Sequence, residues 1–187
     1  MAFVYIVRCN FNDPAREQAW NDWYSGPKIA QMLRKPHFLS CQRFRRETGT
    51  GRGYLALWVL TSPDAFKTKE YTTNWGFFEW ESCIVDWSRD LFDGGSSMAT
   101  DFAVPMDGGL HVVSFDGASA EQANVTRAAN DIARDMTWMP IAGLDRHTPI
   151  IGVRVINGRD FRPLSSLSGS QEALYRPISD FARAEKP

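Results

Sequence analysis

Residues 54–60 read YLALWVL, an almost unbroken apolar run between turn-forming residues. A run of this length and character predicts a central β-strand that is buried on at least part of both faces. The glycine-rich segment 48–53 (TGTGRG) precedes the run and is typical of a hairpin turn. Residues 38–46 (FLSCQRFRR) alternate in character, so a strand is expected there, on the other side of the turn.

Helical segments are expected before and after this hairpin. Asp13 followed by Pro14 indicates a helix start, because the carboxylate can cap a free amide and the fixed φ of proline suits the first turn. This helix is expected to reach about Tyr24. Gly26–Pro27 then interrupts it, and a second short helical piece over residues 28–34 continues at an angle. The sequence Ser62–Pro63–Asp64 predicts another helix start, with the helix ending near Tyr71.

Two further strands complete the first half of the chain. Residues 3–9 (FVYIVRC) and 84–92 (IVDWSRDLF) are rich in β-branched and aromatic residues, and an aromatic loop (NWGFFEWES) spans 74–82. The resulting order is β-α-β-β-α-β. It predicts an α+β fold of the ferredoxin-like type, in which helices cover one face of a four-stranded antiparallel sheet.

The second half repeats this pattern incompletely. A linker rich in glycine and serine is expected over 96–109, which separates a ferredoxin-like domain (1–95) from a degenerate second ferredoxin-like half (110–187). A strand over 110–115 is followed by Ser119 and Gln122, whose spacing indicates a capping box for a helix that reaches about Met136. The remaining expectations are a strand over 149–156, a helix over 171–184 and the loss of at least one strand.

Composition excludes several classes of protein. The 187 residues carry 21 Lys and Arg against 22 Asp and Glu, which argues against a nucleic-acid partner. No apolar run reaches membrane-spanning length, and the first residues do not resemble a signal peptide. The three cysteines have no ligand spacing, so a reduced, cytoplasmic protein is expected. Metal and nucleotide motifs are missing from the sequence, so we expect no metal and no cofactor.

The sheet face opposite the helices is too apolar to stay in water. On one parity it would carry Tyr5, Val7 and Cys9 together with Leu55, Leu57 and Val59, or the neighbours of these residues. A second sheet, from another subunit or from the second half of the chain, would cover this face and form an α+β barrel. The space between the two sheets is then the natural place for a small hydrophobic ligand.

Residues 20–45 and 54–71 resemble the dimeric α+β barrel proteins of the EthD-like and stress-responsive (Dabb) group. The pattern of that group is an aromatic Trp-Tyr pair, a His, a hydrophobic helix, and Pro-Gly before a strand that ends Arg-Phe. The matching residues of this chain are Trp23–Tyr24, Met32–Leu33, Pro36 and Arg43–Phe44. The resemblance covers about the first half of the chain.

The resemblance implies a barrel shared between the subunits of a homodimer. It also implies relatives that include cofactor-free isomerases, cyclases, lyases and monooxygenases, beside many members without known activity. Two positions depart from the pattern. Lys28 stands where the family usually has the pocket His, and His37 stands where a Gly usually follows Pro. The His-based acid–base role of the family therefore does not carry over.

Three residues are candidates for proton transfer: Lys28, His37 and Asp86. Lys28 is either a solvated lysine or, if it points into an apolar cavity, an amine whose pKa is lowered enough to act as base or nucleophile. His37 is either a loop histidine or a proton shuttle. Asp86 either faces solvent at a sheet edge or acts as a general base with a raised pKa.

Aromatic side chains and one arginine are candidates for substrate binding. Trp20, Trp23 and Tyr24 share one helical face and either pack in the core or grip an aromatic ligand. Arg43 either forms surface salt bridges or anchors a carboxylate or enolate. The full expected set is Tyr5, Trp20, Trp23, Tyr24, Arg43, Trp58 and Trp87.

These expectations combine into one hypothesis about function. The chain is expected to be a cofactor-free enzyme that performs proton-transfer chemistry (isomerisation, cyclisation or elimination) on a small hydrophobic compound, an aromatic or polyketide-like carbonyl. The alternative is a small-molecule-binding or accessory protein that has the same barrel and does no chemistry.

Overall fold

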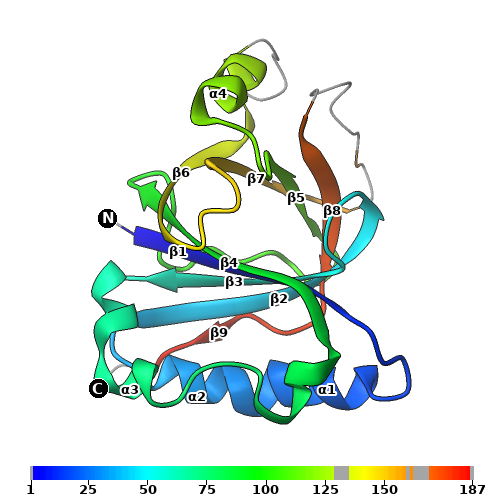
Figure 1. The fold of residues 1–187 in the computed structure, drawn as a ribbon, viewed down its shortest axis with the longest axis vertical. Coiled ribbons are helices and arrows are strands. Elements are labelled where there is room, and N and C mark those ends of the chain that lie inside the picture. Colours follow the sequence, from blue (N-terminus) through cyan, green and yellow to red (C-terminus); the bar gives the residue numbers. More distant parts are fainter. Residues whose placement is uncertain (1, 129–134, 159–160, 162–168, 186–187) are drawn as a thin grey trace.

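The computed structural model describes residues 2–128, 135–158, 161 and 169–185. Eight antiparallel strands of this part of the chain close into one barrel (Figure 1), in the order β3-β1-β4-β6-β7-β5-β8-β2, with β2 pairing back to β3. The first half contributes β1 (Ala2–Phe11), β2 (Phe38–Gly49), β3 (Tyr54–Leu60) and β4 (Ile84–Gly95). The second half contributes β5 (Gly109–Ser114), β6 (Thr137–Leu144), β7 (Ile150–Ile156) and β8 (Gln171–Pro177), and a short β9 (Ala182–Arg183) pairs with β2.

The barrel closes within a single chain. Strand β4 pairs with β6, and β8 pairs with β2, so each half supplies four neighbouring strands and the two halves meet at both edges. Within each half the order of strands is the same, β4-β1-β3-β2 and β8-β5-β7-β6. The resemblance implied a barrel that two subunits close together, and this expectation is wrong. The second half of the same chain provides the strands that a partner subunit was expected to provide.

Two expectations for the second half are wrong. The segment expected to be helical, 171–184, forms strands β8 and β9 instead, because β8 hydrogen-bonds both β5 and β2 and closes the barrel. The second half was also expected to lack at least one strand, but it has all four. The additional strand is β6, which pairs with β4 and β7. In both cases tertiary pairing decides the structure, and local propensity does not.

Helices α1 (Glu17–Trp23) and α2 (Ile29–Leu33) are joined by a π-helical segment, Tyr24–Lys28. The expected break at Gly26–Pro27 is therefore wrong, since the helix continues through the proline. A proline lacks an amide hydrogen and crowds the preceding turn, and a π-turn accommodates such a residue by widening the hydrogen-bond ladder. The amide of Ile29 accordingly donates to the carbonyls of Gly26 and Tyr24.

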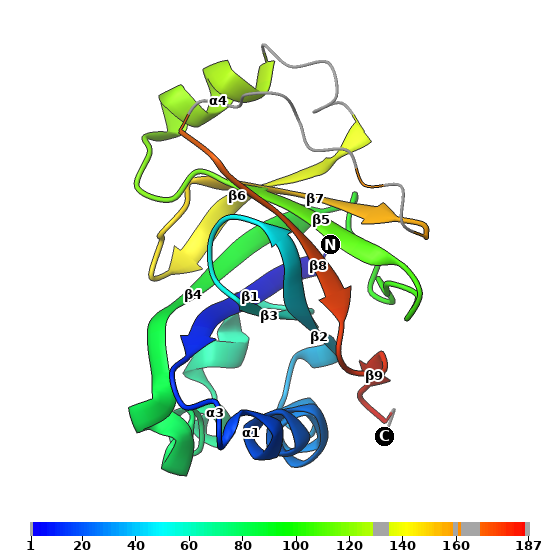
Figure 2. The ribbon, with the colours of Figure 1, turned by 90° about the vertical axis from the view of Figure 1, so that its right-hand side faces the viewer.

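The remaining helical segments are short, apart from α4. A 3₁₀ turn (Pro63–Lys67), α3 (Lys69–Thr72) and a second 3₁₀ turn (Phe78–Cys83) lie on the same side of the barrel as α1 and α2 (Figures 1 and 2). Helix α4 (Ala120–Ala128) lies at the opposite end. The expected capping box is confirmed there: Ser119 N donates to Gln122 Oε1 at 3.0 Å, and Gln122 N donates to Ser119 Oγ at 3.2 Å.

The two faces of the barrel wall carry different cores. Val4, Ile6, Leu55 and Leu57 point into the barrel, where they pack with apolar side chains from the second half. Tyr5, Val7 and Cys9 point outward under the helices, so the expected grouping of these three with Leu55 and Leu57 on one face is corrected. No helix in the described ranges combines the length and the apolar character needed to cross a bilayer.

Candidate functional site

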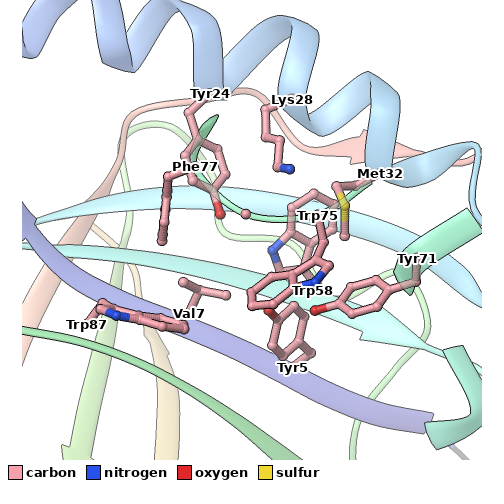
Figure 3. A pocket seen from close by; sticks show the side chains of 11 residues that line it. Tyr5, Val7, Tyr24, Lys28, Met32, Trp58, Tyr71, Trp75, Phe77 and Trp87 are labelled. Carbon is pink, nitrogen blue, oxygen red and sulfur yellow. The ribbon is translucent and has the colours of Figure 1, made fainter. Parts of the chain in front are cut away.

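A pocket lies between the outer face of the barrel and the layer of α1, α2 and α3 (Figure 3). The expected cavity between two sheets is thus replaced by one between a sheet and helices, because apolar side chains fill the barrel interior. It is partly open to solvent, and its volume is about 30 Å³, enough for one or two water molecules. The lining residues are Tyr5, Val7, Tyr24, Lys28, Met32, Trp58, Tyr71, Trp75, Gly76, Phe77 and Trp87.

Lys28 is the ionisable amine of the pocket. Trp20, Tyr24, Lys28 and Met32 follow one another at intervals of four along the helix and are all buried against the sheet, as residues on one helical face are. The side chain of Lys28 is 5% exposed, and Figure 3 shows its Nζ pointing into the pocket.

The surroundings of Lys28 contain aromatic rings and an amide. Its Nζ lies 4.8 Å from the ring centre of Phe78 and 5.9 Å from that of Trp23, and it donates to Oε1 of Gln31 at 3.4 Å. Burial, with a smaller contribution from the charge of Lys35, lowers the pKa of Lys28 to about 8. A substantial fraction of the amine is therefore neutral, and able to accept a proton, slightly above neutral pH.

The other polar groups of the pocket are hydrogen-bond donors. Burial raises the pKa values of Tyr5, Tyr24 and Tyr71, so all three phenols keep their protons. Trp58 Nε1 and the Tyr71 hydroxyl are buried and make no hydrogen bond of good geometry; the phenol of Tyr24 lies near Trp58, and Tyr5 and Arg89 lie near the Tyr71 hydroxyl, where they influence the pKa of the phenols. An unpaired buried donor costs free energy, and its presence in a pocket wall indicates a place where a ligand or water supplies the missing acceptor.

The roof of the pocket is the loop that follows α3. Trp75 and Phe77 lie over the pocket in Figure 3, and Gly76 between them has φ +100°, a conformation that glycine adopts without strain. Trp75 is 39% exposed and stacks on Tyr71, with 5.9 Å between ring centroids. The roof thus consists of large apolar side chains held on a short, partly solvated loop.

The structure brings half of the expected site residues together. Tyr5, Tyr24, Lys28, Trp58 and Trp87 all line the pocket. Trp20 lies beside the pocket, fully buried between Phe11 and Tyr54. Trp23 packs at the edge against Phe78 and Trp80.

Arg43 lies behind the pocket wall. Its guanidinium stacks 4.2 Å from the ring centre of Tyr24 and 4.7 Å from that of Trp20. It donates to Asn21 and Ser25 at 2.9–3.1 Å and is 2% exposed. Arg43 therefore ties helix α1 to strand β2, and neither a surface salt bridge nor a contact with the pocket is present.

His37 lies outside the pocket, in the turn before β2. Its Nδ1 is 3.0 Å from Thr61 Oγ1, and its φ of +72° marks a left-handed turn residue. The side chain lines a surface groove of about 1280 Å³ between α2 and the C-terminal segment. Among the described residues, the unpartnered buried polar atoms include two in the pocket and none in this groove.

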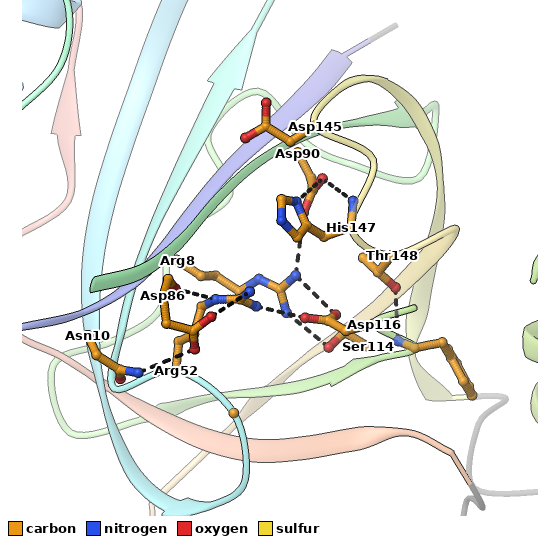
Figure 4. A network of polar contacts seen from close by, with 12 residues as sticks. Arg8, Asn10, Arg52, Asp86, Asp90, Ser114, Asp116, Asp145, His147 and Thr148 are labelled. Carbon is orange, nitrogen blue, oxygen red and sulfur yellow. Dashed lines mark hydrogen bonds and ion pairs between the residues drawn. The ribbon is translucent and has the colours of Figure 1, made fainter. Parts of the chain in front are cut away.

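Asp86 belongs to a different polar network at one mouth of the barrel (Figure 4). Its side chain is 59% exposed and pairs with Arg52 at 3.1 Å, while Arg52 also pairs with Asp116 at 2.7 Å. Arg8 pairs with Asp116 at 3.1 Å and with Asp90 at 3.4 Å. The carboxylate of Asp86 does not line the pocket, although the next residue, Trp87, does.

Four large residues of the pocket were not among the expected site residues: Met32, Tyr71, Trp75 and Phe77. Met32 could have been found from the spacing of four that begins at Trp20. The aromatic loop containing Trp75 and Phe77 was visible in the sequence, but nothing in its local pattern indicates which element it folds over.

Comparison with known proteins shows the fold of the chain. No family model and no curated protein matches the sequence. An anthrone oxidase-like protein matches the structure with a TM-score of 0.63 at 9% identity, over 99% of this chain and 94% of that chain. A candidate monooxygenase from Lactobacillus acidophilus matches with a TM-score of 0.52 at 6% identity, over 99% of this chain and 100% of its own.

A third structure, a candidate monooxygenase from Fusobacterium nucleatum, matches with a TM-score of 0.53 at 8% identity, over 100% of this chain and 98% of its own. At such low identity these likenesses show an α+β barrel and do not transfer an activity. The expected barrel fold is confirmed, while membership of the EthD-like or stress-responsive group is not shown.

Proposed function

We propose that the chain is a cofactor-free enzyme that removes an acidic C–H proton from a small aromatic carbonyl compound. The observation that carries the proposal is Lys28, a buried amine with a pKa of about 8 that faces a pocket of aromatic rings. Active sites are where burial is commonly used to shift a pKa towards the working pH. The reaction type and the substrate class below follow from the chemistry of the pocket walls.

Lys28 acts as the general base in this proposal. Its neutral amine takes the proton from a carbon next to, or conjugated with, the carbonyl group. The electron pair of the broken C–H bond moves onto the carbonyl oxygen and gives an enolate, while Lys28 becomes an ammonium ion. Return of the proton to another carbon completes an isomerisation, and loss of a leaving group from the enolate completes an elimination.

The donors of the pocket stabilise the enolate oxygen. Among the residues that line the pocket, the Tyr71 hydroxyl and Trp58 Nε1 are the two buried polar groups without a well-formed hydrogen bond, and a developing negative charge would supply the acceptor that each of them lacks. Donors fixed in a site that excludes water stabilise such a charge more strongly than water does. The rings of Tyr5, Tyr24 and Trp87 supply the apolar surface that binds a planar ligand.

The name of one structural neighbour contains a compound of this substrate class: that protein is anthrone oxidase-like. Anthrone is a tricyclic aromatic ketone whose ring CH₂ is acidified by conjugation with the carbonyl group. It is therefore a suitable first probe, and its enolate can also react with dissolved oxygen once the proton has been removed.

The test is exchange of the anthrone CH₂ protons for deuterium. Anthrone is incubated with the protein in D₂O buffer under nitrogen, and loss of the CH₂ signal is followed by NMR against a protein-free control. We expect the catalysed rate to rise with pH, with its midpoint near pH 8, as the Lys28 amine loses its proton. Lys28→Met should lower this rate by about 10²- to 10⁴-fold.

Lys69→Met is the matched control, because Lys69 is exposed on α3 and should exchange anthrone at the wild-type rate. Exchange that persists in Lys28→Met would contradict the proposal. Tight binding of anthrone without any catalysed exchange would favour the alternative, a small-molecule-binding protein with the same barrel. Oxygen uptake in air would then show whether the enolate goes on to oxidation.

A further inference from the structure

The pocket, although partly open to solvent, is too small in this structure for any aromatic ligand. Its volume of about 30 Å³ compares with roughly 300–1,000 Å³ for pockets that enclose drug-sized ligands. The walls formed by the barrel and by α1 and α2 belong to a packed core, so they are the least able to move. The roof, which consists of a few residues on a partly exposed loop, is the part whose displacement would enlarge the pocket.

Residues 74–78, here called the lid, have fixed ends and a free centre. At one end Asn74 N donates to the carbonyl of Tyr71 at 3.1 Å, and at the other end Trp80 N donates to the carbonyl of Phe77 at 3.0 Å. Gly76 lies between them with φ +100°, and no atom lies within 4 Å of the position that a Cβ would occupy there. The centre of the lid is thus held by its aromatic side chains.

Arg89 is the residue on which the lid rests. It lies on β4, opposite Val7 of the pocket wall, and its guanidinium carbon is 4.5 Å from the ring centre of Trp75 and 5.7 Å from that of Trp87. A guanidinium stacked on aromatic rings is held by cation–π attraction. The charge of Arg89 also reaches the Tyr71 phenol, whose pKa it lowers against the larger effect of burial.

Asp145, from the second half of the chain, fixes Arg89 in this position. Its carboxylate accepts from Arg89 Nε and from the Arg89 amide, both at 3.2 Å, and its own amide donates to the Arg89 carbonyl at 3.0 Å. This double backbone and side-chain contact holds the guanidinium on one side, which leaves its face towards Trp75.

We propose that residues 74–78 form a lid over the pocket and that Arg89, braced by Asp145, is the positioning residue that holds Trp75 closed. Opening separates Trp75 from Arg89 and Tyr71 and admits the ligand to Lys28. The proposal rests on the pocket of the proposed function for its biological meaning, but the closed position of the lid is a property of the protein without ligand. It can therefore be tested separately.

The test is hydrogen–deuterium exchange, measured by mass spectrometry on the unliganded protein. In Arg89→Leu we expect the peptide that covers residues 72–80 to exchange about 3- to 30-fold faster, as expected for loss of one or two cation–π contacts. Arg89→Lys, which keeps the charge, should retain part of the protection, and Asp145→Asn should lose part of it. A peptide from β5 should be unchanged, which distinguishes lid opening from general destabilisation.

A second variant should open the lid without removing any side chain that contacts it. Gly76→Ala disfavours φ +100° and has no clash to resolve, so it should also raise exchange in residues 72–80. The control is Arg183→Leu, which breaks the exposed pair of Arg183 and Asp101, 3.1 Å apart, and should leave the lid unchanged. Unchanged lid exchange in both Arg89→Leu and Gly76→Ala would overturn the proposal.

Binding of anthrone under nitrogen provides the functional readout. In stopped-flow fluorescence, Arg89→Leu should raise both the association and the dissociation rate constants several-fold, whereas Arg183→Leu, which changes only an exposed ion pair, should leave both unchanged. If anthrone does not bind to any variant while Arg89→Leu still exposes the lid, the lid stands and the proposed function fails. If anthrone binds with the same rates in Arg89→Leu, the lid does not control access.

Discussion

The two halves of the barrel have the same strand order but different outer faces. In the first half Phe3 lies opposite Leu60 at the strand end, and in the second half Gly109 lies opposite Ile156. Two residues further along, Tyr5 lies opposite Trp58, and His111 lies opposite Arg154. Two residues further along again, Val7 lies opposite Arg89, and Val113 lies opposite Glu172. Arg89 of the first half therefore corresponds to Glu172 of the second.

The aromatic pocket of the first half is thus replaced in the second half by polar groups that pair with one another. His111 Nε2 lies 2.7 Å from Glu172 Oε1, and its Nδ1 lies 3.1 Å from Arg154 NH2. Because Arg154 donates to Nδ1, the imidazole is neutral with its proton on Nε2. In the first half, by contrast, donors face a cavity without partners. The same scaffold therefore carries an aromatic pocket on one face and a polar cluster on the other.

The largest change in stability is expected from substitutions in the hydrophobic core that the two halves share. Leu57 of β3 and Leu110 of β5 are both fully buried in the barrel interior. Leu57→Ala and Leu110→Ala should each lower the free energy of unfolding by about 2–5 kcal/mol. Because the halves share one core, both variants should show a single urea transition.

Tryptophan fluorescence distinguishes a shared core from two independent ones. Six of the seven tryptophans lie in the first half, at residues 20, 23, 58, 75, 80 and 87. Leu110→Ala, although it is in the second half, should shift the fluorescence midpoint as much as Leu57→Ala does. A first-half signal that ignores Leu110→Ala would mean that the halves unfold separately.

The next effect concerns the pocket of the first half. A lysine whose pKa falls from 10.5 to about 8 on folding destabilises the folded protein by about 3 kcal/mol when it is charged. This penalty is fully present below pH 8 and disappears as the pH rises towards 10.5. Lys28→Met should therefore raise the melting temperature at pH 7, and the gain should shrink at pH 10. A gain that is the same at both pH values would show that the lysine is not desolvated.

The smallest effect concerns the polar cluster of the second half. Burial lowers the pKa of His111 and outweighs the opposing effect of the Glu172 carboxylate, and Arg154 at Nδ1 adds a smaller lowering. The folded state then binds fewer protons than the unfolded one, so stability should fall as the pH drops below about 6.5, by at most ~1.4 kcal/mol per pH unit. His111→Asn should lack this component between pH 6.5 and 5.5, as measured by urea unfolding at each pH.

Local sequence patterns identified the elements more reliably than their arrangement. The apolar run 54–60 forms a strand with those bounds, and Ser119 and Gln122 form the expected capping box. The segment 171–177 became a strand because two neighbouring strands needed a partner. Pro27 remained inside a helix because a π-turn absorbed it. The strand depends on contacts with distant residues, and the π-turn departs from the usual helix-breaking effect of proline, so local propensity predicted neither outcome.

The sequence predicted only part of the pocket, because its local pattern does not show how distant segments pack together. Lys28 was singled out by its place in a familiar pattern, and it does face the pocket. Asp86 looked like a buried base because it interrupts an apolar strand, but its φ of +49° places it in an irregular part of β4, where it pairs with Arg52. Periodicity assigns residues to two faces of a sheet, but it does not say which face the helices cover.

Closure of the barrel by one polypeptide has a consequence for how a destabilising residue can be tolerated. In a symmetric dimer every substitution occurs twice, so an uncompensated buried amine in one active site would be present in the other as well. In this chain the position that corresponds to Trp58 is Arg154 in the other half. The free-energy penalty of burying Lys28 therefore occurs only once per molecule. Covalent linkage thus allows one lobe to keep a destabilising buried amine while the sequence of its counterpart is free to differ.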